Sequence, residues 1–115
     1  MEQSVMYQVM GDCLVVQMPR ELDQHTADGL IQEMDFLLDS YGVHRLVFDF
    51  EDTEFMDSAG IGVVIGRSKK LKYIEGITYA VHMSERVERI FRMSGIDQIV
   101  QIIEEDKTDG KAMDQ

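Results

Sequence analysis

The 115-residue sequence predicts an α/β fold, in which helices pack against a mixed β-sheet that begins with an N-terminal β-hairpin. Three observations support this class. Two short β-rich runs near the start are separated by two residues that suit a tight turn. The apolar spacing then changes to the three-and-four period of an amphipathic helix. Strand-like and helix-like segments alternate along the rest of the chain, which is typical of parallel crossover units.

The first half of the chain supplies the hairpin and one long helix. Residues 5–10 and 13–18 are the two predicted strands, because Gly11 and Asp12 between them suit a two-residue turn. The helix is expected between Asp23, placed as an N-cap, and Gly42, placed as a C-terminal stop. Its predicted inner face consists of apolar residues at helical spacing: Ala27, Leu30, Ile31, Met34, Leu37, Leu38 and Tyr41.

In the second half of the chain, predicted strands and helices alternate. The mostly apolar run 44–50 predicts a strand in the interior of the sheet, and 51–57 interrupts it. A helix is expected from Ser58, as its cap, to about residue 73, with lysines near its carboxyl end. The remaining elements are predicted in order: a strand at 77–82, a helix between Ser84 and Gly95, and a strand at 98–103.

Length and charge limit the function classes. We expect a single domain over 1–115, ending in a charged tail at about 104–115 that is either frayed helix or disordered. The formal charge of −11 argues against nucleic acid or an anionic membrane as a partner, because both would be repelled. With no signal-like segment or membrane-length apolar run, we expect a soluble, cytoplasmic protein. The single cysteine, Cys13, is interpreted as a core residue in a reducing compartment.

The stretch FMDSAGIGVVIG, residues 55–66, contains the main candidate functional residues of the sequence. Its glycines resemble a nucleotide-binding loop only loosely, because Gly62 and Gly66 are separated by three residues where that loop has two. We interpret these two glycines instead as allowing the helix to approach the sheet closely. Met56 occupies the place of the first glycine of a serine-hydrolase elbow, so the strained turn of such a nucleophile is not encoded.

A metal site is the third alternative, because five acids occur in nine positions: Asp49, Glu51, Asp52, Glu54 and Asp57. The glycine and the spaced glutamate of a calcium loop are missing, so the favoured interpretation is a solvated acidic loop. We therefore expect no metal site, no cofactor and no catalytic residue.

Ser58 itself suits an N-cap, but that role does not explain an exposed hydroxyl beside several carboxylates. A phosphate added there would bring about −1.5 to −2 charges to the helix end. The helix dipole would favour the phosphate, while Glu54 and Asp57 would oppose it. Any partner docked at this position would then meet a changed surface.

Three segments, in order along residues 18–100, carry a resemblance to a known family. RELDQHTADGL, FMDSAGIGVVIGR and RVERIFRMSGI, in this order, resemble the motifs of bacterial anti-sigma factor antagonists, the STAS domain family. The spacing is most similar to that of sporulation members of the family that act on an anti-sigma factor. The predicted fold is accordingly a STAS-type mixed sheet.

The resemblance implies a non-enzymatic switch in transcription regulation. In such proteins the serine matching Ser58 is phosphorylated by the anti-sigma factor, a serine kinase, and the unphosphorylated form binds that kinase and releases the sigma factor. A PP2C-type phosphatase restores the unphosphorylated form. The resemblance also implies a kinase-facing surface, expected to contain Glu21, Asp23, Asp57, Ser58, Ala59, Gly60 and Ile61.

Two positions depart from the family pattern. Ala59 replaces a second hydroxyl, which leaves Ser58 as the only acceptor in the motif, and Arg20 replaces the glycine before Glu21. Some relatives are not phosphorylated and act as scaffold subunits of larger assemblies or transporters. The alternative function is therefore a constitutive STAS scaffold in which Ser58 is only a cap.

Overall fold

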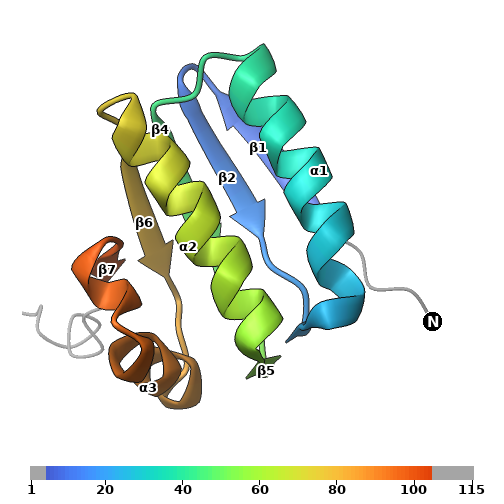
Figure 1. The fold of residues 1–115 in the computed structure, drawn as a ribbon, viewed down its shortest axis with the longest axis vertical. Helices are drawn as coiled ribbons and strands as arrows, with labels where there is room; N and C mark the ends of the chain where they lie inside the picture. Colours follow the sequence, from blue (N-terminus) through green and yellow to red (C-terminus); the bar gives the residue numbers. More distant parts are fainter. Residues whose placement is uncertain (1–4, 105–115) are drawn as a thin grey trace, which may run out of the picture.

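The structure is a computed structural model, which describes residues 5–104. The chain forms a sheet with helices on one face (Figure 1). Its elements follow in the order β1 (Met6–Met10), β2 (Cys13–Gln17), β3 (Glu21–Leu22), α1 (Gln24–Ser40), β4 (Arg45–Asp49), β5 (Phe55–Met56), α2 (Ser58–Tyr73), β6 (Ile77–Val81), α3 (Glu85–Ser94), the short 3₁₀ helix η1 (Ile96–Gln98) and β7 (Gln101–Ile103). The predicted α/β class, with a mixed sheet and an N-terminal hairpin, is confirmed.

The main sheet has five strands in the order β1-β2-β4-β6-β7. β1 and β2 pair antiparallel across the turn at Gly11, whose φ of +61° suits glycine. The other three strands continue the sheet in parallel with β2, so β4 lies at its centre as its apolar sequence predicted. In this register Asp49, the last residue of β4, is paired with Val81, the last residue of β6.

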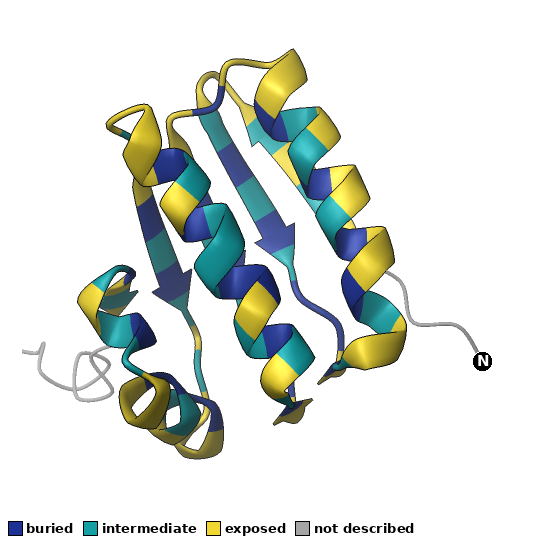
Figure 2. Cartoon of the chain, viewed as in Figure 1, coloured by how far each residue is buried: buried dark blue, intermediate teal, exposed yellow. Residues whose placement is uncertain are grey.

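The core lies between the sheet and the helices α1 and α2, which run across the same face (Figure 1). Strand residues alternate, so that Leu14, Val16, Leu46 and Phe48 are completely buried while their neighbours are partly exposed. Figure 2 shows buried and exposed residues alternating along α1 and α2, and the buried apolar ones belong to the same core cluster as the strand residues.

α3 packs at one end of this arrangement through an aromatic contact. The rings of Phe91 in α3 and Phe50, which follows β4, meet edge to face with centroids 5.3 Å apart. Ser84 caps the helix by accepting a hydrogen bond from the Val87 amide, and Gly95 ends it in a left-handed conformation, as predicted. The end of β4 is thereby held close to α3.

Several sequence-based expectations are wrong in detail. Residues 98–100 belong to η1 and a turn, so the last strand is shorter than the predicted 98–103. The interruption at 51–57 contains a strand, β5, which pairs with the equally short β3. Cys13 is only partly buried, because strand alternation turns it away from the face that carries Leu14. The tail prediction concerns residues that, after Glu104, lie outside the described range.

Candidate functional site

The two helices that cover the sheet begin side by side. β3 leads into α1 and β5 leads into α2, and these two short strands pair in parallel, with Leu22 opposite Met56. The Asp57 amide continues the pairing by donating a hydrogen bond of 3.2 Å to the Leu22 carbonyl. The pairing therefore places Asp23 and Asp57, the residues just before the two helices, next to each other.

Asp23 caps α1 with a reciprocal pair of hydrogen bonds. Its carboxylate accepts from the His25 and Thr26 amides at 2.9 and 3.2 Å, and the Thr26 hydroxyl accepts from the Asp23 amide at 3.0 Å. These bonds satisfy amide groups that have no partner inside the helix. The side chain is half-buried, so the predicted role of Asp23 as a cap is confirmed while part of it remains at the surface.

Asp57, and not Ser58, caps α2. Its carboxylate accepts from the Ala59 and Gly60 amides at 2.9 and 3.1 Å. Ser58 is the first residue of the helix and is exposed. The expectation that Ser58 is the cap is wrong, because an extended aspartate one residue earlier already satisfies these helix donors. The Ser58 hydroxyl is consequently available at the surface.

Gly60 explains how the helix can start so close to the paired strands. A Cβ atom at this position would overlap the Leu22 carbonyl oxygen and would lie 2.8 Å from both Leu22 Cγ and Met56 Cγ. By contrast, a Cβ at Gly62 or Gly66 would meet nothing within 4 Å. The prediction that Gly62 and Gly66 permit close approach is wrong, and Gly60 has that role.

The predicted surface is thus divided between exposed and supporting residues. Glu21 and Ser58 are exposed, whereas Ala59 and Ile61 are partly buried and pack against the core. Gly60 is buried, so it can affect a partner only through the position it allows the helix to take. The structure brings these residues together on adjacent segments and separates exposed from supporting positions, while their contact with a partner stays a prediction.

The acidic loop before Ser58 is anchored by contacts that the sequence analysis missed. The buried hydroxyl of Thr53 donates to the Pro19 carbonyl at 2.8 Å. The Glu54 and Phe55 amides donate to the Arg20 carbonyl at 2.8 and 3.2 Å. The last two bonds use only the backbone of Arg20, so this pairing does not require glycine there. Two-residue strands have too few positions to show a period, and no sequence signal indicated them.

The surface around Ser58 is rich in carboxylates. Glu21, Glu54, Asp23 and Asp57 lie on the paired segments that lead into α1 and α2. Arg86 approaches the same loop from α3, where its guanidinium lies 3.4 Å from the Glu54 carbonyl oxygen. The arrangement presents the exposed Ser58 at a capped helix start within an acidic surface.

Comparison with known proteins agrees with this geometry. The family model of the STAS domain matches residues 4–108. The anti-sigma F factor antagonist of Paenibacillus polymyxa is 33% identical over 89 residues, which are 77% of this chain and 76% of the relative. The anti-sigma-B factor antagonist of Staphylococcus epidermidis is 28% identical over 93 residues, which are 81% and 85% of the two chains.

Solved structures show the same fold. The anti-sigma factor antagonist SpoIIAA, in its unphosphorylated form, matches with a TM-score of 0.71 and 24% identity over 96% of each chain. The phosphorylated form of SpoIIAA from Bacillus matches with a TM-score of 0.72 and 22% identity, over 99% of this chain and 100% of the other. The chain therefore belongs to the STAS domain family, and the resemblance predicted from its motifs is confirmed.

The described helices carry no membrane-spanning segment. Within residues 5–104, none of them combines the length and the apolar composition that crossing a bilayer requires.

Proposed function

We propose that this chain is an anti-sigma factor antagonist whose binding is switched by phosphorylation of Ser58. In the unphosphorylated form it binds an anti-sigma factor that is itself a serine kinase, and the sigma factor is released. Phosphate on Ser58 ends that binding, and a phosphatase of the PP2C type restores it. The proposal places the protein in the cytoplasm, where sigma factors engage RNA polymerase, and gives it a regulatory rather than an enzymatic role.

The exposed hydroxyl of Ser58 at the amino end of α2 is the observation that carries the proposal. A kinase must reach the acceptor oxygen, and an exposed first-turn residue gives that access. The names of the relatives support antagonism of an anti-sigma factor, and the two solved forms of SpoIIAA support a phosphorylated state in the family.

The local hydrogen bonds explain how a phosphate could act as a switch. A phosphate at a helix amino end is usually satisfied by the free backbone amides there. Here the Asp57 carboxylate already accepts from the Ala59 and Gly60 amides. A phosphate on Ser58 would therefore compete with that carboxylate, or remain at the surface with about −1.5 to −2 charges.

A partner fitted to the neutral surface would then have to bury that charge. Burial of an unpaired anion is strongly unfavourable, and the nearby Asp23 and Asp57 add repulsion instead of compensation. Binding would be lost without a change in the fold. Glu21, Asp23 and Ile61, together with the first turn of α2, are the contact surface in this proposal.

The test is transfer of labelled phosphate from ATP by the cognate anti-sigma kinase. Wild type should be labelled and Ser58→Ala should not. Ser40→Ala is the matched control, because Ser40 is another exposed helical serine, at the carboxyl end of α1; this variant should be labelled like wild type.

Absence of label in wild type, with full binding of the kinase, would overturn the switch. That result would instead favour the scaffold alternative, in which the chain is a constitutive subunit of a larger assembly. Equal labelling of wild type and Ser58→Ala would reject Ser58 as the acceptor while leaving antagonism intact.

A further inference from the structure

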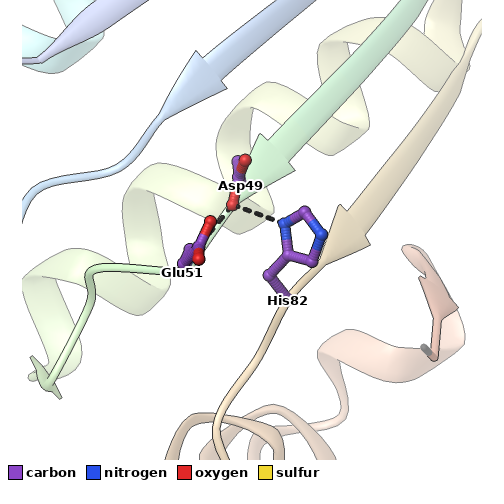
Figure 3. Close-up of side chains that lie close together, drawn as sticks. All are labelled: Asp49, Glu51 and His82. Carbon is purple, nitrogen blue, oxygen red and sulfur yellow. Dashed lines mark hydrogen bonds and ion pairs between the residues drawn. The ribbon is translucent and has the colours of Figure 1, made fainter. Parts of the chain in front are cut away.

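A second cluster of chemically active side chains lies at the carboxyl ends of β4 and β6, apart from the two capped helix starts. Asp49 is the last residue of β4, Glu51 follows two residues later, and His82 comes directly after β6 (Figure 3). One ligand atom from each of the three residues lies within 4.8 Å of the other two. His82 lies about thirty positions beyond the acidic run, so the composition of that run alone does not indicate it.

We propose that Asp49, Glu51 and His82 form a binding site for a divalent transition-metal ion of the Zn²⁺ type. The donor set decides the class of ion. Two carboxylates alone would suit Mg²⁺ or Ca²⁺, whereas an imidazole beside them favours zinc and its neighbours. Three protein ligands leave a coordination position for water or for a group of a partner.

The backbone holds two of the ligands in place. β4 and β6 are adjacent and parallel, and Asp49 lies opposite Val81, the residue before His82. The His82 Nδ1 atom is 3.0 Å from Asp49 Oδ1, and the Glu51 amide donates to that same oxygen at 3.0 Å. Asp49 is largely buried, with 14% of its side chain exposed, which restricts its rotamer. Figure 3 shows all three side chains gathered at this end of the sheet.

Only a small rearrangement separates this geometry from coordination. Zinc lies about 2.0–2.2 Å from nitrogen and carboxylate ligands, so in its usual tetrahedral geometry two ligand atoms are about 3.3–3.6 Å apart. The three ligand atoms already lie within 4.8 Å of one another, and rotation of the exposed Glu51 side chain can bring them to coordination distance. The hydrogen bond between Asp49 and His82 is then replaced by two bonds to the ion, with the ring proton on Nε2.

The surroundings of the three ligands are rich in carboxylates. Glu51 and His82 border a pocket that is also lined by Glu88 and Glu104. Arg92 pairs with both of those glutamates, at 2.6 and 3.4 Å. Within residues 5–104, by contrast, neither Asp49 nor Glu51 forms an ion pair with lysine or arginine. A bound cation would lower the negative charge of this part of the pocket.

The test is calorimetric titration of the full chain with ZnCl₂, and with MgCl₂ as a comparison. Wild type should bind one Zn²⁺ saturably and Mg²⁺ far more weakly. The main variant is His82→Asn, because His82 has a φ of +60° and asparagine tolerates that conformation better than most residues. Its Zn²⁺ affinity should fall by at least about tenfold, as should that of Glu51→Gln.

The matched control is His44→Asn. His44 is also an exposed histidine next to a strand, but it lies at the other end of β4, where its Nδ1 contacts the Gly42 carbonyl at 3.0 Å. This variant should bind Zn²⁺ like wild type. A thermal melt gives a second readout, since a ligand that binds only the folded state raises its midpoint.

Two results would overturn the proposal. One is the absence of saturable Zn²⁺ binding by wild type. The other is equal binding by wild type, His82→Asn and Glu51→Gln, which would indicate diffuse attraction to the acidic surface. Should His82→Asn fail to fold, Glu51→Gln still decides the question. None of these outcomes depends on phosphorylation of Ser58.

Discussion

Substitution of Gly60 by alanine should destabilise the fold by moving the start of α2. The added Cβ would overlap the Leu22 carbonyl oxygen and lie 2.8 Å from side-chain carbons of Leu22 and Met56. Side chains can rotate away from such contacts, but the carbonyl belongs to the β3–β5 pairing and accepts the Asp57 amide. The helix start, with Ser58 on it, would have to shift.

The magnitude follows from comparison with Gly62→Ala. Alanine gains up to about 1 kcal/mol over glycine inside a helix, and this gain applies to both positions. Overpacking costs about 1–3 kcal/mol and applies only at Gly60, because a Cβ at Gly62 meets nothing within 4 Å. We expect the two variants to differ by that overpacking cost. Gly62→Ala should be more stable than wild type and Gly60→Ala less stable, since the obstructing atom is backbone.

Urea unfolding followed by circular dichroism measures this difference through the midpoint of each transition. The slopes should match that of wild type, so that a change of midpoint reports a change of stability. Equal midpoints for Gly60→Ala and Gly62→Ala would refute the close-packing role of Gly60. The phosphorylation test on Gly60→Ala would then show whether a displaced helix start also affects modification.

Three further predictions concern caps, the loop and a tyrosine. Asp57→Ala should cost about 0.5–2 kcal/mol of stability through loss of the cap, whereas Ser58→Ala should change it by less than about 0.5 kcal/mol; equal losses in thermal melts would restore Ser58 as the cap. Thr53→Val should cost about 1–3 kcal/mol, because the Pro19 carbonyl loses its buried donor; urea midpoints would show this, and an unchanged midpoint would contradict it. Burial and the hydrogen bond to Glu33 raise the pKa of Tyr7 above its ordinary value of 10.0. The folded state therefore disfavours ionisation, and this contribution to stability should be present below pH 10 and be lost as pH rises above it. When pH is raised from about 9 to 11.5, the free energy of unfolding measured in urea should fall less for Tyr7→Phe than for wild type. Parallel pH profiles of the two proteins would refute the raised pKa of Tyr7.

The sequence predicted the helices and strands that have a strong periodicity of apolar residues or a clear capping residue. The long amphipathic run produced α1, with Asp23 and Gly42 at its ends as expected. The β3–β5 pair escaped prediction, because each strand has two residues and its partner lies more than thirty positions away. Residues 98–100 have strand-like composition, but the turn that follows Gly95 makes them part of η1 and its exit.

The sequence motif predicted which residues belong to the site, and the structure corrected the roles of Ser58 and Gly60 within it. Asp23 and Ser58 do lie on adjacent segments, which the family pattern implied and the strand pairing explains. Both Asp57 and Ser58 are residue types that commonly cap helices, so the sequence alone does not decide between them. The backbone conformation of Asp57 makes it the cap. The role of Gly60 depends on a backbone atom from another segment, which no local pattern reveals.

The most direct test of the central claim is the affinity of the cognate anti-sigma kinase for one preparation of this chain, before and after phosphorylation of Ser58. Calorimetry with the purified kinase, and mass spectrometry to confirm the phosphate, gives both values. The account predicts that affinity falls by at least about tenfold, or about 1.4 kcal/mol, on phosphorylation. Equal affinities of the two forms would contradict it.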